Sequence, residues 1–157
     1  MSLSSAARRQ QIIGAATKPK IRKKNTGMVR KGLYAIDEVL SHITDPDCLK
    51  ERVEFEGDMV HVASVRLKCF KFNGLVCVTC GIVGEYFAKE RSPCRSERVL
   101  YHFNLYGLDP EGDEVLMTKD HIRPRWLGGR DDLANLATMC KVCNEAKGGD
   151  YSVSETL

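Results

Sequence analysis

The sequence of 157 residues lacks several features that would place it in large classes of protein. It has no run of about 18 apolar residues, which argues against a membrane-spanning helix and against a membrane partner. Its first residues contain no apolar segment of the length that a secretion signal requires. We therefore expect a cytoplasmic protein of a bacterial cell, with a phage as a further candidate source.

Acidic residues are absent from the first 36 residues, which contain nine basic residues. The rest of the chain has 15 basic and 21 acidic residues, so a cationic segment precedes a mildly acidic body although the net charge is only +3. Residues 1–32 are also poor in aromatic residues, and we predict a flexible basic arm; a solvated or partly helical tail is the alternative. The arm predicts phosphate contacts with a nucleic acid. The residues expected to make them are Lys18, Lys20, Arg22, Lys23, Lys24, Arg30 and Lys31.

The chain length fits one domain, which we place at residues 33–150, followed by a polar tail at 151–157. Apolar residues at helical spacing predict an amphipathic helix over 33–43. Partial alternation of apolar and polar residues favours strands over 59–72. Residues 84–98 are charged and contain a proline, so this segment is interpreted as a connection.

The C-terminal third predicts a strand over 99–108, a turn, and a returning strand over 115–122. A glycine-containing loop, a second short strand at 133–139 and a helix at 141–147 follow. The expected fold class is α+β, with a strand–strand–helix order in this third and additional strands and an N-terminal helix before it.

Four of the seven cysteines form two pairs with the spacing that zinc prefers. Cys77 and Cys80 follow the predicted turn at Asn73-Gly74, and Cys140 and Cys143 flank the start of the predicted C-terminal helix. Four thiolates predict a closed tetrahedral Zn²⁺ site that stabilises the fold and leaves no position for a reacting water. The remaining cysteines are interpreted as small buried residues; they are Cys48, Cys69 and Cys94.

The segment from Leu116 to Gly149 contains four further polar residues beside the second cysteine pair. Asp120 and His121 are adjacent at the end of a predicted strand, Asn135 lies in a Leu-Ala-Asn-Leu segment, and Asn144 follows Cys143 directly. This arrangement resembles the HNH endonuclease family, whose ββα-metal site contains an Asp-His pair, a central Asn and a final His or Asn. The resemblance covers roughly a quarter of the chain and implies the ββα-metal fold.

The resemblance also implies a role for each residue. Asp120 and Asn144 would hold one catalytic cation, and their oxygen ligands suit Mg²⁺ or Mn²⁺ better than zinc. His121 would act as general base, a role that suits an imidazole with an ordinary pKa of about 6.5. Asn135 would brace the loop and orient the histidine. Arg123 and Arg125 follow the histidine and are expected to contact phosphates.

The predicted function is therefore metal-dependent hydrolysis of DNA, leaving a 3′-hydroxyl and a 5′-phosphate by family resemblance. One site nicks one strand, so double-strand cleavage would require two events or a homodimer. Two alternatives stay open: a non-catalytic zinc-ribbon module that binds DNA, and a nuclease that acts on RNA. Individually, the four polar residues also fit ordinary structural roles, as a strand-end carboxylate, a turn former or a helix cap.

Overall fold

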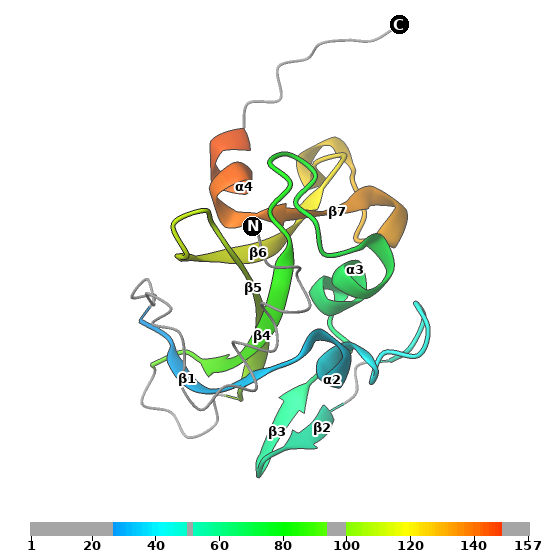
Figure 1. The fold of residues 1–157 in the computed structure, drawn as a ribbon. Coiled ribbons are helices and arrows are strands. Elements are labelled where there is room, and N and C mark those ends of the chain that lie inside the picture. Colours follow the sequence, from blue (N-terminus) through cyan, green and yellow to red (C-terminus); the bar gives the residue numbers. More distant parts are fainter. Residues whose placement is uncertain (1–26, 50–51, 94–99, 149–157) are drawn as a thin grey trace, which may run out of the picture.

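The structure is a computed structural model that describes residues 27–49, 52–93 and 100–148. It shows a mixed fold of helices and antiparallel strands (Figure 1). The main sheet has the strand order β1 (Val29–Tyr34), β4 (Gly84–Arg91), β5 (His102–Leu108), β6 (Glu114–His121) and β7 (Leu136–Cys140). A separate hairpin pairs β2 (Arg52–Phe55) with β3 (Asp58–His61).

In the described part of the chain, three short helices accompany the strands: α2 (Ile36–Leu40), α3 (Val65–Asn73) and α4 (Lys141–Lys147). Two 3₁₀ turns, η1 (Arg125–Leu127) and η2 (Leu133–Asn135), interrupt the loop between β6 and β7. Within the described ranges, no helix has the length and apolar character needed to cross a bilayer.

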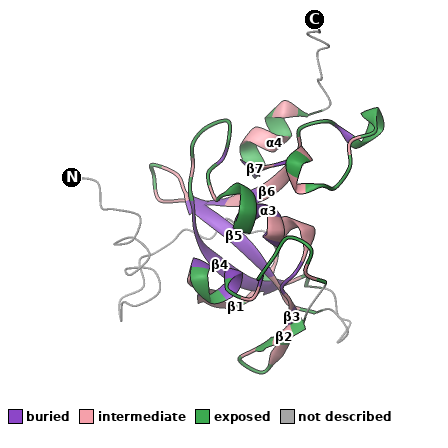
Figure 2. Cartoon of the chain, turned by 90° about the vertical axis from the view of Figure 1, so that its right-hand side faces the viewer, coloured by how far each residue is buried: buried purple, intermediate pink, exposed green. Residues whose placement is uncertain are grey.

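The hydrophobic core lies on the face of the sheet that α2 and α3 cover. Phe87 of β4, Phe103 and Leu105 of β5, and Leu67 and Phe70 of α3 belong to one cluster of almost fully buried side chains. Figure 2 shows β4 and β5 as the most continuously buried part of the sheet. This packing of helices against the sheet fixes the strands on which the C-terminal residues are carried.

β4 corrects the prediction that residues 84–98 form a connection; residues 94–98 of that range lie outside the described residues. The first seven positions of β4 are buried, including Glu85, Lys89 and Glu90. Lys89 Nζ donates to Phe55 O at 2.7 Å and to an Asp58 carboxylate oxygen at 2.9 Å. Charged residues can occupy a buried strand here because partners far away in the sequence satisfy them.

On the opposite face of the sheet, Arg30 of β1 lies between two buried carboxylates. Its guanidinium donates to Glu90 at 2.8 Å and to both oxygens of Glu114 at 2.6 and 3.0 Å. Tyr106 and Asn104 donate to the second oxygen of Glu90, at 2.8 and 2.7 Å. Arg30 is therefore an internal ion-pair partner, and we correct its assignment as a DNA contact.

α3 corrects the second half of the strand prediction for residues 59–72. The backbone N–H of Leu67 donates to the Ser64 hydroxyl at 3.2 Å, which caps the first turn of the helix. The helix ends at Gly74, whose φ of 97° favours glycine. The partial alternation of apolar residues predicted a strand, whereas Ser64 and Gly74 supply the cap and the end of a helix.

The N-terminal boundary also differs from the prediction. β1 begins at Val29, inside the arm predicted for residues 1–32, and the helix predicted over 33–43 is confined to Ile36–Leu40. Residues 1–26 of the arm and the predicted tail at 151–157 lie outside the described residues.

The C-terminal third contains the expected hairpin, a further strand and a helix, but the strand predicted over 133–139 is replaced at its start by the 3₁₀ turn η2 and runs over Leu136–Cys140. β5 and β6 form the expected hairpin, β6 pairs antiparallel with β7 from Met117↔Cys140 to His121↔Leu136, and α4 follows β7 directly. α4 packs on β6 and β7, so its side chains face the strand that carries Asp120.

Candidate functional site

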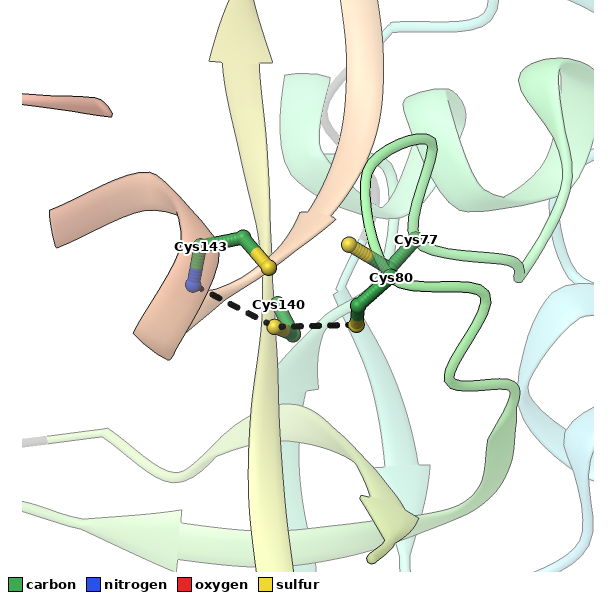
Figure 3. A group of neighbouring side chains, drawn as sticks. All are labelled: Cys77, Cys80, Cys140 and Cys143. Atoms are coloured by element: carbon green, nitrogen blue, oxygen red, sulfur yellow. Dashed lines mark hydrogen bonds between the residues drawn. The ribbon is translucent and has the colours of Figure 1, made fainter. Parts of the chain in front are cut away.

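The four paired cysteines converge although about 60 residues separate the pairs (Figure 3). All four Sγ atoms lie within 4.8 Å of one another, and Cys80 Sγ lies 3.7 Å from Cys140 Sγ. A tetrahedral zinc with bonds of about 2.3 Å requires sulfur separations of about 3.8 Å. The arrangement is therefore compatible with zinc.

Two local turns present the sulfur atoms. Between the bridge partners Val76 and Val83, the N–H of Cys77 donates to Ile82 O at 2.8 Å, and Gly81 takes a positive φ of 81° where the backbone reverses. At the other pair, Cys143 N–H donates to Cys140 Sγ at 3.4 Å at the start of α4. Amide donors of this kind stabilise the deprotonated thiolate form of cysteine, which is the form that binds a metal ion.

The pKa values of the thiols reflect this crowding. Burial opposes ionisation of Cys77, but backbone hydrogen bonds near Cys80 and Cys140 outweigh it and lower the pKa to about 6. A hydrogen bond with Cys140 raises the pKa of Cys143 to about 12, and burial raises the pKa of Cys140. A bound divalent cation would remove the repulsion that opposes four thiolates at such distances.

Protein contacts connect the same two segments. Val78 N–H donates to Thr138 O at 3.0 Å, the Thr138 hydroxyl donates to Gly74 O at 2.6 Å, and Asn73 Nδ2 donates to the carbonyl oxygens of Leu133 and Leu136, both at 2.8 Å. The segment that carries Cys77 and Cys80 is thus attached to β7 and, through Leu133, to the end of the loop that follows β6.

Asp120 and Asn144 lie on facing surfaces of β6 and α4. Asn144 Nδ2 donates to the Thr118 hydroxyl at 2.9 Å, and the Lys147 ammonium bonds the Asp120 carboxylate. Thr118 and Asp120 share one face of β6, because they are two residues apart. The amide oxygen of Asn144, which takes no part in this hydrogen bond, is of the kind that can act as a metal ligand.

The His121 side chain belongs to a neighbouring cluster on the loop after β6. Its Nε2 lies 2.6 Å from Asp131 Oδ1, and Arg125 donates to both oxygens of Asp131 at 2.9 and 2.7 Å. These bonds from Arg125 and His121 hold the pKa of Asp131 well below its usual range. Lys147 connects the two clusters, because it also donates to the backbone oxygen of His121 at 3.3 Å.

The contacts of His121 also indicate its tautomer. An ionised Asp131 only accepts hydrogen bonds, so Nε2 must carry hydrogen in the 2.6 Å contact. The 3.4 Å contact from Arg125 Nε requires the opposite state of Nε2. We favour the Asp131 contact because it is shorter and involves a charged acceptor. In the neutral ring, Nδ1 is then the nitrogen with the lone pair.

Asn135 ties together both ends of this loop. Its Oδ1 accepts from Arg123 N–H at 2.8 Å, and its Nδ2 donates to Arg123 O at 3.1 Å and to Arg130 O at 2.9 Å. Its backbone oxygen accepts from Ile122 N–H at 2.9 Å. Gly129 fits against the same strand end, where an added Cβ would lie 1.8 Å from Arg123 O.

Apart from Arg30, which is part of the buried ion-pair cluster, the predicted basic contacts fall into three groups. Arg125 has a side chain that is 65% exposed, and Arg123 is also exposed beside the candidate site. Lys31 is half exposed and pairs with Asp58 at 2.6 Å. The remaining predicted contacts in the arm lie outside the described residues; they are Lys18, Lys20, Arg22, Lys23 and Lys24.

The sequence prediction assigned no catalytic or metal-binding role to Thr118, Asp131 or Lys147. Lys147 is three residues after Asn144 and Thr118 two before Asp120, so helix and strand periods place them beside residues already identified. Asp131 offered no such signal, because its position depends on the path of the loop.

The HNH endonuclease family model matches residues 109–152. The predicted likeness to this family is therefore confirmed for the segment that contains β6, β7 and α4. No curated protein and no solved structure matches the chain.

Proposed function

We propose, from the match of residues 109–152 to HNH endonucleases, that the protein is a metal-dependent nuclease that hydrolyses phosphodiester bonds of DNA. The observation that carries the proposal is the placement of Asp120 and Asn144 on facing surfaces of β6 and α4, with His121 next in the chain. β6, β7 and α4 would constitute the ββα-metal motif of the family.

The catalytic cation would be held by the Asp120 carboxylate and the Asn144 amide oxygen. One carboxylate and one neutral oxygen suit Mg²⁺ or Mn²⁺ and leave most of the coordination shell to water and phosphate. When bound, the ion supplies charge neutralisation at the phosphate and at the leaving oxygen. Lys147, whose ammonium pairs with the Asp120 carboxylate, would have to yield that carboxylate to the ion.

His121 would remove the proton from the attacking water. The Asp131 contact at Nε2 favours the tautomer in which Nδ1 accepts that proton, and the carboxylate would stabilise the imidazolium that forms. Asn135 would fix the direction of the strand end from which His121 projects, through its three side-chain bonds across the loop.

The four cysteines would hold a structural Zn²⁺. Four sulfur ligands close the coordination sphere, so this ion would not activate water. Its role would be to attach the turn at Cys77 and Cys80 to the start of α4, and thereby to fix the position of Asn144 relative to β6.

The DNA would approach over the exposed Arg123 and Arg125, with the basic arm as a second set of phosphate contacts. Deleting residues 1–26 should flatten the dependence of the DNA dissociation constant on salt, because each lost phosphate contact lowers the logarithmic slope by about 0.9. An unchanged slope would remove the arm from the proposal. One site per chain predicts nicking by a monomer, and a homodimer would be needed for concerted double-strand cleavage.

The decisive experiment is cleavage of supercoiled plasmid by the zinc-loaded protein, with and without Mg²⁺ or Mn²⁺. His121→Ala should lower the rate by about a hundredfold or more while zinc content and DNA binding stay unchanged. His42→Ala is the matched control, because the ring of His42 packs on Phe55 away from this site. Cleavage that survives His121→Ala would refute the assignment of the base.

Two results of the same assay would favour the alternatives. A wild type that binds DNA without cleaving it at any metal concentration would be a zinc-ribbon binding module. Preferential cleavage of RNA, with both polymers offered at the same salt concentration, would change the substrate but not the residues.

A further inference from the structure

The loop between β6 and β7 exposes apolar side chains beside the candidate base. Trp126 is 66% exposed, Ile122 57% and Leu127 42%, and all three lie within six residues of His121. Figure 2 shows this loop as largely exposed and projecting from the body of the protein. Three exposed apolar side chains on one short loop make this loop a candidate contact surface.

The loop holds a fixed shape without burying these side chains. Leu127 N–H and Gly129 N–H both donate to Pro124 O, at 3.0 and 2.9 Å, and Gly128 takes a φ of 84° after η1. The side chain of Asn135 ties the flanking backbone at Arg123 and Arg130. A preorganised loop of this kind presents Trp126 with little ordering entropy left to lose on binding.

The charges around Trp126 indicate which partner fits. Basic residues flank it on both sides in the chain, and the side chains of Arg125 and Arg130 are 65% and 82% exposed. Both pair with neighbouring aspartates, Arg125 with Asp131 at 2.7 Å and Arg130 with Asp132 at 3.2 Å, but pairs this exposed contribute little and can exchange for phosphate. Arginines interleaved with an aromatic ring suit a nucleic acid, which offers phosphates and flat bases together.

We propose that Trp126 stacks on a base next to the phosphate that is cleaved, and that it thereby positions the DNA strand on the active site. The proposal rests on the nuclease function. Arg125 supports it, because this neighbour of Trp126 reaches within 3.4 Å of His121 Nε2, so a phosphate at His121 lies beside the loop. Stacking accepts any base and therefore would fix the position of the strand more than its sequence.

Trp126 is the single tryptophan of the chain, so its emission reports the contact directly. Zinc-loaded protein without Mg²⁺ or Mn²⁺ is titrated with duplex DNA while tryptophan emission and DNA anisotropy are recorded. We expect saturable quenching with the same dissociation constant as the anisotropy. Unchanged emission at saturating DNA would overturn the proposal.

Variants supply the second measurement. Trp126→Ala should weaken DNA binding about tenfold, Trp126→Phe should stay within about threefold, and Leu49→Ala, a control at an 82% exposed residue, should bind as wild type does. Equal affinities for Trp126→Ala and wild type would overturn the proposal, as would emission that depends on protein concentration without DNA, the sign of a second copy on the loop. Plasmid cleavage without quenching refutes the stacking alone, whereas quenching without cleavage refutes the nuclease function.

Discussion

The cluster around Arg30 and the loop that carries Arg125 both pair arginine with carboxylates, and they differ in how much water reaches them. Arg30 is 16% exposed and its partners Glu90 and Glu114 are 0% and 2% exposed in their side chains. Arg125 is 65% exposed and Asp131 43%. The buried charges are occupied by one another and hold the sheet together, whereas the exposed charges remain accessible to a ligand.

The largest effect should come from the cysteine cluster, on which the geometry of the exposed loop depends. Cys140→Ser removes one of four ligands, and structural zinc sites contribute on the order of 10 kcal/mol to folding. We expect loss of zinc and of the cooperative thermal transition. Cys48→Ser, at a cysteine outside the cluster, is the control. Full zinc content in a folded Cys140→Ser protein would contradict the proposed site.

Arg30 and Lys31 are adjacent basic residues that test the buried cluster against an exposed pair. Arg30→Ala leaves Glu90 and Glu114 buried without their cation and should lower the free energy of unfolding by about 3–5 kcal/mol. Lys31→Ala should cost far less than Arg30→Ala, because its pair with Asp58 is half exposed and Lys89 still contacts Asp58. Chemical denaturation measures both. Equal effects would mean that burial does not separate the two residues.

Asp131→Asn tests whether the exposed cluster acts in the reaction. An amide still fills the position beside Nε2 but lacks the charge that stabilises the imidazolium, so we expect kcat to fall about tenfold with little change in KM or stability. Asp132→Asn is the control, since Asp132 pairs only with the exposed Arg130 among the described contacts. A change in stability without a change in kcat would assign Asp131 a structural role.

The smallest effect concerns acid. Hydrogen bonds from Arg125 and His121 hold the pKa of Asp131 below its ordinary value, so this carboxylate contributes stability above that ordinary value and loses the contribution as the pH falls through the folded-state pKa. NMR titration of the Asp131 carboxyl should therefore show no protonation through mildly acidic pH. Titration at the ordinary value for aspartate would show that the cluster does not persist in solution.

The difference between the two regions also explains what the sequence predicted. β5, β6, β7 and α4 were predicted because their apolar periods and turn residues are local signals. β4 was not predicted because lysine and glutamate, as at Lys89 and Glu90, usually lie at the surface. Both are buried here because Lys89 bonds Asp58, and Glu90 accepts hydrogen bonds from Arg30, Asn104 and Tyr106. Contacts with partners so distant in the sequence produce no periodic pattern of residues from which the strand could be predicted.

The candidate site shows the same division. The cysteine pairs and the polar residues of the family pattern have fixed spacing, and the structure brings the four sulfur atoms together as predicted. Arg30 was predicted to contact DNA because the sequence gives its charge and does not reveal that its side chain is largely buried. Asp131 was overlooked because its approach to His121 depends on the turn at Gly128 and on the bonds of Asn135.

The hydrogen bonds of Asn135 across the loop affect which side chains of the loop can be substituted. Every hydrogen bond that Asn135 makes across the loop is to main-chain atoms, at Ile122, Arg123 and Arg130. Side chains at the tip between these residues, including Trp126, can therefore be substituted without a shift of His121. A substitution at this tip should change what the loop contacts while the backbone next to His121 stays in place.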